Sequence, residues 1–96
     1  MIAKKHEIDY KTILAVCDKE HVGKTFEDGP ICFTASTKFY SGEDITAKQL
    51  ETMLEEADSI NLFGNKCVGI AIKKGFASEK SVKIIAGIKH AQVYRV

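Results

Sequence analysis

The chain has 96 residues, of which 45% are hydrophobic and 28% charged, with one proline, seven glycines and a formal net charge of +1. This length corresponds to one small domain, and the composition excludes a disordered, collagen-like or disulfide-rich chain. Apolar runs such as residues 13–17 and 84–88 are far shorter than the roughly 18 residues that a membrane span needs, so no membrane partner is expected.

The cysteines and the first residues indicate the compartment. Cys17, Cys32 and Cys67 are an odd number, widely spaced, and none belongs to a C-x-x-C pair. Free cysteines in apolar surroundings usually act as small core residues, and a chain without disulfides is typical of a reducing compartment. Residues 1–7 contain no apolar stretch that would serve as a signal peptide. We therefore expect a cytoplasmic protein, and we expect residues 1–9 to form a flexible N-terminus.

Three short strands are expected in the first half of the chain. Residues 10–17 are apolar on both alternating faces, which is typical of a strand in the middle of a sheet. Residues 22–26 and 31–36 are expected to be two further strands. The Glu-Asp-Gly-Pro segment at 27–30 between them is the strongest turn signal in the sequence. This pattern predicts a meander of short hairpins.

Two helices are expected in the middle of the chain. Thr46 and Gln49 fit a capping box, and apolar residues recur at helical intervals over residues 50–57. A second, shorter helix is expected over residues 66–74, because Gly75 stands where a left-handed C-terminal cap belongs.

The remaining segments complete the prediction of the fold. Residues 60–64 are expected to connect the two helices, and residues 82–86 and 91–96 to form two strands joined around 87–90. The sequence therefore predicts a single α+β domain over residues 1–96, in which two helices pack on one face of an antiparallel or mixed sheet.

Charge is distributed unevenly along the chain. Residues 1–40 carry six basic and six acidic side chains, residues 41–58 carry one and six, and residues 59–96 carry seven and one. Such asymmetry favours a surface for an anionic partner, and phosphate contacts would make RNA binding strongly salt-dependent. The alternative is an ordinary solvated face, or pairing with the acidic helix. The expected phosphate contacts are Lys66, Lys73, Lys74, Lys83, Lys89 and Arg95.

Five segments spread over nearly the whole chain carry a resemblance to a known family. They are Val-Cys-Asp at 16–18, Gly-Lys-Thr-Phe at 23–26, Phe39-Tyr40 with Gly42-Glu43, Asn-Leu-Phe-Gly at 61–64, and Gly-Ile-Lys-His-Ala-Gln at 87–92. Together they resemble the small archaeal family of domain of unknown function 424. In that family a proline commonly precedes the histidine, whereas this chain has Lys89 there. The resemblance implies a cytoplasmic archaeal protein without an established activity, for which RNA is a suspected ligand.

His90 and Gln92 are the most suggestive pair of polar residues. On a strand they would lie on the same face, where they could read a base edge or orient a phosphate. The alternative is a hydrogen-bonded pair that closes the last hairpin. A general acid–base role of His90 would need a second group within hydrogen-bond distance and a nearby nucleophile, and no adjacent residue supplies one.

Two aromatic residues are candidates for stacking on an unpaired base. Phe63 could be exposed by the connection between the helices, or it could pack into the core while Asn61 and Gly64 form the turn. The same two alternatives apply to Phe39 and Tyr40, and Tyr40 is expected to be the more exposed of the two, because Gly42 follows it and its surroundings are polar. Asn61 and Gly64 remain candidate site residues.

Two other patterns do not support a site. Gly-Lys-Thr at 23–25 resembles the end of a phosphate-binding loop, but Asp18 stands where that loop needs its first glycine and no helix start follows. Nucleotide hydrolysis is therefore not expected. No local pair with metal-ligand spacing is found among Cys17, Cys32, Cys67, His21 and His90. No metal and no cofactor are expected.

The leading hypothesis is a non-enzymatic module that binds RNA, such as tRNA or ribosomal RNA, in translation or RNA processing. The basic residues would contact phosphates, and His90, Gln92 and Tyr40 would contribute finer recognition. The alternative is a protein–protein adaptor, whose acidic helix or exposed sheet edge docks on a partner. A third hypothesis is a small enzyme or ligand-binding protein that uses His90 with Asp18 or Asn61.

Overall fold

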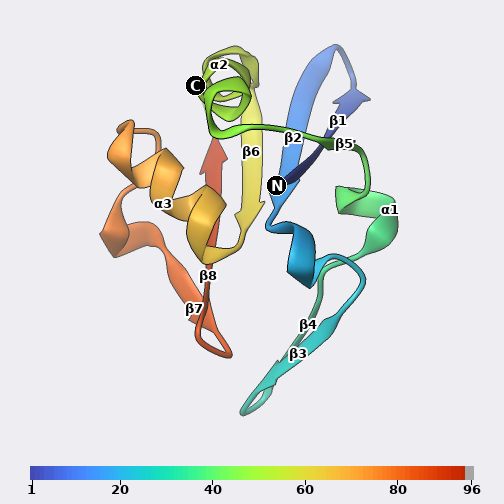
Figure 1. Ribbon diagram of the computed structural model, residues 1–96, viewed down its shortest axis with the longest axis vertical. Coiled ribbons are helices and arrows are strands. Elements are labelled where there is room, and N and C mark those ends of the chain that lie inside the picture. The colour runs from blue at the N-terminus through green and yellow to red at the C-terminus, as the bar shows by residue number, and fades with distance from the viewer. Residues whose placement is uncertain (95–96) are drawn as a thin grey trace.

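A six-stranded mixed sheet forms the centre of the computed structural model, which describes residues 1–94 (Figure 1). The strand order is β5-β1-β2-β6-β8-β7, and neighbours are antiparallel except β2 and β6, which are parallel. The strands of this sheet are β1 (Ile2–Ile8), β2 (Lys11–Cys17), β5 (Glu43–Asp44), β6 (Ser59–Phe63), β7 (Lys83–Ile85) and β8 (Ile88–Tyr94). A separate hairpin consists of β3 (Thr25–Asp28) and β4 (Ile31–Thr34). The α-helices are α1 (Thr37–Tyr40), α2 (Ala47–Glu56) and α3 (Asn65–Lys73), and short 3-10 helices span Lys19–His21 and Glu79–Ser81.

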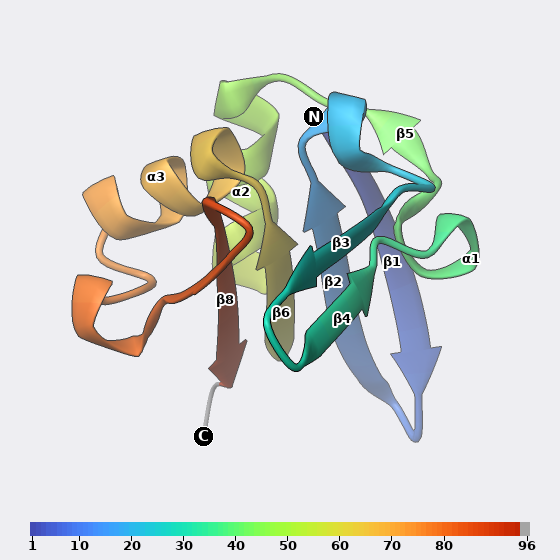
Figure 2. The ribbon, with the colours of Figure 1, turned by 90° about the horizontal axis from the view of Figure 1, so that it is seen from below.

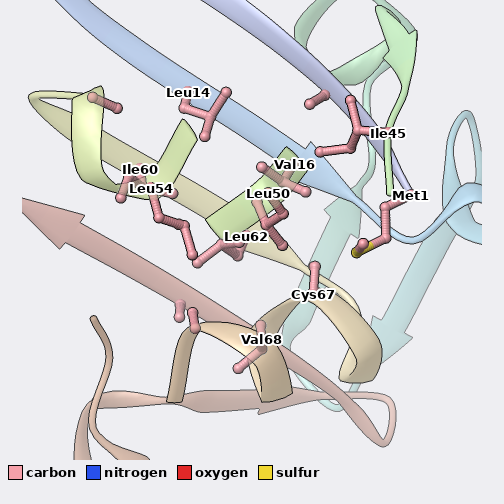
Figure 3. Packing of buried hydrophobic residues seen from close by; sticks show 14 residues of the cluster. Met1, Leu14, Val16, Ile45, Leu50, Leu54, Ile60, Leu62, Cys67 and Val68 are labelled. Carbon is pink, nitrogen blue, oxygen red and sulfur yellow. The ribbon is translucent and has the colours of Figure 1, made fainter. Parts of the chain in front are cut away.

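Helices α2 and α3 cover one face of the sheet, which confirms the predicted α+β arrangement. The side chains of Leu50 and Leu54 on α2 and Val68 on α3 meet Leu14 and Leu62 of the central strands (Figure 3). All five are fully buried. Burial of one such side chain contributes about 1.5–3 kcal/mol, so this cluster is the main source of stability.

The boundaries of the two long helices agree with the sequence prediction. The backbone N–H of Gln49 donates to Thr46 Oγ1 at 3.2 Å, and the backbone N–H of Thr46 donates to Gln49 Oε1 at 2.8 Å. The predicted capping box is therefore confirmed. At the end of α3, Gly75 has φ +80°, and the N–H of Phe76 donates to the carbonyl of Ala71 at 2.9 Å, as expected for a left-handed cap.

The prediction that residues 60–64 only connect two helices is wrong. Most of this segment belongs to β6, which lies between β2 and β8 in the middle of the sheet. Ile60 and Leu62 face the main core, and Phe63 faces the opposite side with no exposed surface. A strand with two apolar faces is expected inside a sheet. Its five residues are too few to distinguish it, by periodicity alone, from an apolar loop.

The expected flexible N-terminus is also absent, because residues 2–8 form strand β1. This strand pairs with β2 along its whole length, from Ile2 opposite Cys17 to Ile8 opposite Lys11. β5 pairs on the other side with Ile2 and Ala3 only. Charged residues such as Lys5 and Glu7 are typical of an edge strand and hide the alternation that identifies strands in a sequence.

Within residues 1–94, the second face of the sheet is covered at one end only, by the β3–β4 hairpin and α1. There Cys17, Phe63 and Ile88 are buried beneath Phe26 and Phe33 of the hairpin. The predicted turn at residues 27–30 joins β3 to β4, but β3 does not pair with β2, so the predicted meander is wrong. In Figure 2 the hairpin crosses in front of the sheet, and the ends of β2 and β8 extend beyond it.

The two strands predicted at the end of the chain are β7 and β8, joined by a turn at Ala86 and Gly87 that has φ +51° and +80°. β8 begins at Ile88, within the segment expected to be the turn. Residues 95 and 96, which were predicted to continue this strand, lie outside the described residues. None of the helices in residues 1–94 has the length and apolar character required to cross a membrane.

Candidate nucleic-acid interface

Four polar or aromatic side chains lie together on the face of the sheet opposite α2 and α3. His90, Gln92 and Tyr94 alternate along β8 and therefore point to the same face. Lys83 of β7 pairs with His90 and so shares that face. The prediction that His90 and Gln92 project to the same side of a strand is confirmed.

These side chains line a hollow of about 260 Å³. Its walls are Lys83, His90, Gln92 and Tyr94, with Ser81 from the segment before β7. The ring of Tyr94 is 73% exposed, and its hydroxyl donates to Gln92 Oε1 at 3.0 Å. An ammonium, an imidazole, an amide and an aromatic ring therefore converge at one place on the surface.

A second hollow of about 380 Å³ lies on the other side of Tyr94. It is lined by Ile8, Asp9, Lys11, Ile13, Asp58, Ser59 and Tyr94. The register explains how distant segments meet here, because Ile13 pairs with Ser59, Ser59 pairs with Tyr94, and Ile8 pairs with Lys11. We call this surface the open sheet face. It consists of Asn61 and of those residues of the two hollows that point from the sheet to this side: Ile8, Lys11, Ile13, Ser59, Lys83, His90, Gln92 and Tyr94.

A hydrogen-bond network beneath this face orients His90. The Oδ1 atom of Asn61 accepts a hydrogen bond from the hydroxyl of Tyr40 and a second one from Nε2 of His90 at 3.3 Å. Burial raises the pKa of Tyr40, so the phenol keeps its proton and donates it. Burial, and secondarily the ammonium of Lys83, lowers the pKa of His90 from its usual value of 6.5. The neutral imidazole therefore donates from Nε2 and keeps a lone pair on Nδ1.

The expectation that Tyr40 is exposed is wrong. Its side chain is 2% exposed, and it contributes to the interface only by holding Asn61. Gly42 does not expose the preceding aromatic residue. It allows the chain to pass against β1, because a Cβ on Gly42 would lie 2.9 Å from the carbonyl carbon of Ala3.

Phe63 is a core residue and not a stacking platform, so the core alternative is confirmed. It has no exposed surface, and its ring lies 4.5 Å from that of Phe33 and 5.9 Å from that of His90, between centroids. Phe33 is in turn 5.1 Å from His90. The imidazole thus rests against two aromatic rings while it lines the first hollow.

The predicted basic residues do not gather on one face. Lys66 and Lys73 are exposed on α3, on the other side of the sheet from Lys83. Lys89 alternates with His90 and so points to the face of α3. The Nζ atom of Lys74 lies 2.6 Å from a carboxylate oxygen of Glu51 on α2, which raises the pKa of Lys74 and balances its positive charge with a negative one. Arg95 lies outside the described residues.

Asp18 and Gly64 have structural positions. The carboxylate of Asp18 accepts the backbone N–H groups of Lys66 at 2.9 Å and Cys67 at 3.0 Å, at the start of α3. Gly64 has φ +137°, and a Cβ there would lie 2.7 Å from the Cβ of Asp18. Of the two proposed acid–base partners of His90, the structure places only Asn61 in contact with it.

Asp18, Glu20 and His21 each have a possible metal-ligand atom within 4.8 Å of the other two. Both oxygens of Asp18, however, already accept backbone N–H groups of α3.

Tyr94 and the second hollow were missed by the sequence prediction. Tyr94 follows Gln92 by two residues in a predicted strand, so its position on the same face could have been predicted from the sequence. The contribution of β1 to the second hollow could not, because that strand was not predicted.

Comparisons with known proteins identify a family but no activity. The family model described as "Protein of unknown function (DUF424)" matches residues 6–96. A crystal structure of an uncharacterized conserved protein from the archaeon Methanopyrus kandleri is similar, with a TM-score of 0.78 at 22% sequence identity. The similarity covers 99% of this chain and 93% of that chain. No curated protein matches the sequence. The two structures share the α+β fold, and the interface has to be interpreted from its own chemistry.

Proposed function

This chain belongs to the DUF424 family, whose description names no function, and from the geometry of its sheet we propose that it binds single-stranded RNA through the open sheet face. The observation that carries the proposal is the position of Tyr94. Its exposed ring stands between two hollows, with Lys83, His90 and Gln92 on one side and an apolar floor on the other.

The chemistry of the first hollow fits a nucleotide backbone. Lys83 supplies a positive charge for a phosphate, and the amide of Gln92 and the neutral ring of His90 supply hydrogen-bonding groups for a phosphate or a base edge. Asn61 holds the imidazole, so its orientation does not have to be fixed when a ligand binds. Groups ordered before binding lose less conformational entropy in the complex.

Tyr94 favours an unpaired strand over a duplex. Bases stack on exposed aromatic side chains only when they are not paired and stacked inside a helix. Among residues 1–94, no helix or β-ribbon projects from the open sheet face to enter a groove, and the β3–β4 hairpin lies over the other end of the sheet (Figure 2). Recognition by an open sheet surface is a common way of holding single-stranded RNA.

The experiment is fluorescence anisotropy with labelled single-stranded RNA at about 50 and 200 mM salt. We expect Tyr94→Ala to weaken binding by about tenfold or more, since stacking on one base contributes about 1–3 kcal/mol. Lys83→Gln should weaken binding and lower the slope of log K against log salt by about 0.7, the value for one phosphate on a single strand. The matched control is Lys48→Gln on α2, an exposed lysine on the other side of the sheet.

Absence of binding at low salt would contradict the proposal, and so would equal effects of the Lys83 and Lys48 substitutions. The second outcome would mean that general surface charge holds the RNA. The same titration with Lys66→Gln and Lys73→Gln tests whether the lysines of α3 belong to the interface.

A protein partner is a second candidate, favoured by an unpaired sheet edge. β7 pairs only with residues 88–90 of β8, so within residues 1–94 the outer edge of residues 91–94 has no strand beside it. A strand from a partner could extend the sheet there. This alternative predicts a complex that survives nuclease treatment and is unaffected by Lys83→Gln.

A further inference from the structure

The two hollows beside Tyr94 differ in their polar groups. The first contains the ammonium of Lys83 and the side chains of Ser81, His90 and Gln92. The second has an apolar floor of Ile8 and Ile13, and its polar rim includes two carboxylates. A phosphate would be repelled by carboxylates, so the second hollow suits a different part of a nucleotide from the first.

The size and lining of the second hollow suit an aromatic base. Its volume of about 380 Å³ lies within the range of about 300–1,000 Å³ that small-molecule sites occupy. Ile8 is 58% exposed and Tyr94 is 73% exposed, an unusual display of apolar and aromatic surface. The hydrogen bond from the Tyr94 hydroxyl to Gln92 fixes the phenol ring that separates the hollows. A base stacked on Tyr94 would also cover the exposed surface of Ile8.

The free hydrogen-bonding groups around this hollow are mainly acceptors. The Oδ2 atom of Asp58 accepts the backbone N–H of Thr12 at 2.7 Å, while its Oδ1 atom has no hydrogen bond within residues 1–94. The carboxylate of Asp9 has none within the same residues. The donors are the exposed ammonium of Lys11 and the hydroxyl of Ser59, because the hydroxyl of Tyr94 already donates to Gln92.

We propose that the hollow beside Tyr94 is a base pocket that prefers cytosine over uracil. The inference rests on the proposed function. Cytosine and uracil have nearly the same size and differ at position 4, where cytosine carries an amino group and uracil a carbonyl oxygen. A carboxylate accepts a hydrogen bond from the amino group of cytosine, whereas it repels the carbonyl oxygen of uracil. The free oxygens of Asp9 and Asp58 therefore select the base, and the apolar floor and Tyr94 hold it.

The test compares binding of oligocytidine and oligouridine of equal length to the full chain. We expect the wild-type protein to bind oligocytidine about tenfold more tightly. The variant Asp9→Asn/Asp58→Asn should reduce that preference to less than about threefold. Both substitutions are compatible with the fold. The amide oxygen of an asparagine at 58 can still accept the N–H of Thr12, and asparagine tolerates the φ of +51° at position 9.

The matched control is Glu56→Gln, which removes one exposed carboxylate on α2, away from the open sheet face. It should leave the preference for cytosine unchanged. If both oligonucleotides bind equally tightly in a Tyr94-dependent and salt-dependent way, the base pocket is refuted while the RNA-binding proposal stands. The same holds if the doubly substituted protein keeps the full preference. If neither oligonucleotide binds at low salt, the proposed function itself is refuted.

Discussion

Gly64 and Asp18 show how one residue without a side chain positions a helix. The side chain of Asp18 occupies the space that a Cβ at position 64 would need, and its carboxylate satisfies two N–H groups at the start of α3. Helix starts leave such groups without intrahelical partners, and a negative charge there also interacts favourably with the helix dipole. Gly64 is therefore required by the close approach of a side chain that is distant in the sequence.

We expect Gly64→Ala to lower the free energy of unfolding by about 3 kcal/mol, through strain at a φ of +137° and displacement of the Asp18 carboxylate. Urea unfolding followed by circular dichroism measures this. The control is Gly69→Ala inside α3, where a Cβ would meet no atom within 4 Å. That change should raise stability by about 0.5–1 kcal/mol. Equal effects of the two substitutions would contradict the explanation.

The residues of the interface could be predicted only in part. The shared face of His90 and Gln92 follows from alternation along one strand. The burial of Tyr40 depends on Asn61, which is 21 residues away in the sequence and in a strand that was not predicted. Pairing of the basic residues with the acidic helix is one of the alternatives that the sequence leaves open, but that Lys74 pairs with Glu51 depends on how the two helices pack.

The turn between β1 and β2 is the least favourable local element of the fold. Asp9 and Tyr10 join the strands with φ values of +51° and +66°, as in the type I′ turns that usually contain Asn-Gly. Tyr10 is fully exposed, and its ring stacks on no other aromatic ring within residues 1–94. A left-handed conformation costs a residue such as tyrosine about 1–2 kcal/mol, and packing does not compensate for it here.

Tyr10→Gly is expected to stabilise the protein by about 0.5–1 kcal/mol, because glycine adopts this conformation without strain. Tyr10→Ala removes the ring but keeps the strain, so it should change stability by less than about 0.5 kcal/mol. Chemical denaturation of the three proteins gives both values. A loss of stability in both variants would show that the ring makes stabilising contacts.

Among the elements, those with a complete local pattern were predicted. Helices α2 and α3 were recognised from their caps and spacing, and β2 was recognised from its two apolar faces, whereas the single-turn helix α1 was not predicted. β1 and β6 were missed for opposite reasons. β1 has many charged residues and is paired by β5 only at Ile2 and Ala3, so most of its outer side is a sheet edge. β6 is a short interior strand that lies between two helices in the sequence. In both cases pairing with a distant segment stabilises the strand.

Over the whole molecule, burial separates the three cysteines. Cys17 and Cys67 are buried, whereas Cys32 is exposed on the hairpin, so the expectation that all three are core residues is wrong for Cys32. Burial raises the pKa of Cys17 to about 12, with a smaller contribution from Asp18, and also raises that of Cys67. The thiolate is the reactive form, so both buried thiols are protected by exclusion of water and by protonation.

A thiol-titration reagent should therefore detect one cysteine in the native protein and all three in denaturant. Cys32→Ser should remove the native signal and leave stability nearly unchanged, since the side chain is exposed. Rapid labelling of Cys17 or Cys67 under native conditions would contradict the predicted burial, because opening of either site requires loss of the core around the central strands.

The open sheet face joins Ile8 and Lys11 from the first hairpin to Tyr94 at the end of the last strand. During synthesis that hairpin emerges from the ribosome early, but the rest of the surface emerges only when β8 has left the ribosome. A fragment cut before residue 88 would lack His90, Gln92 and Tyr94, three of the residues that line the first hollow. Binding at this surface would therefore distinguish completed molecules from truncated ones.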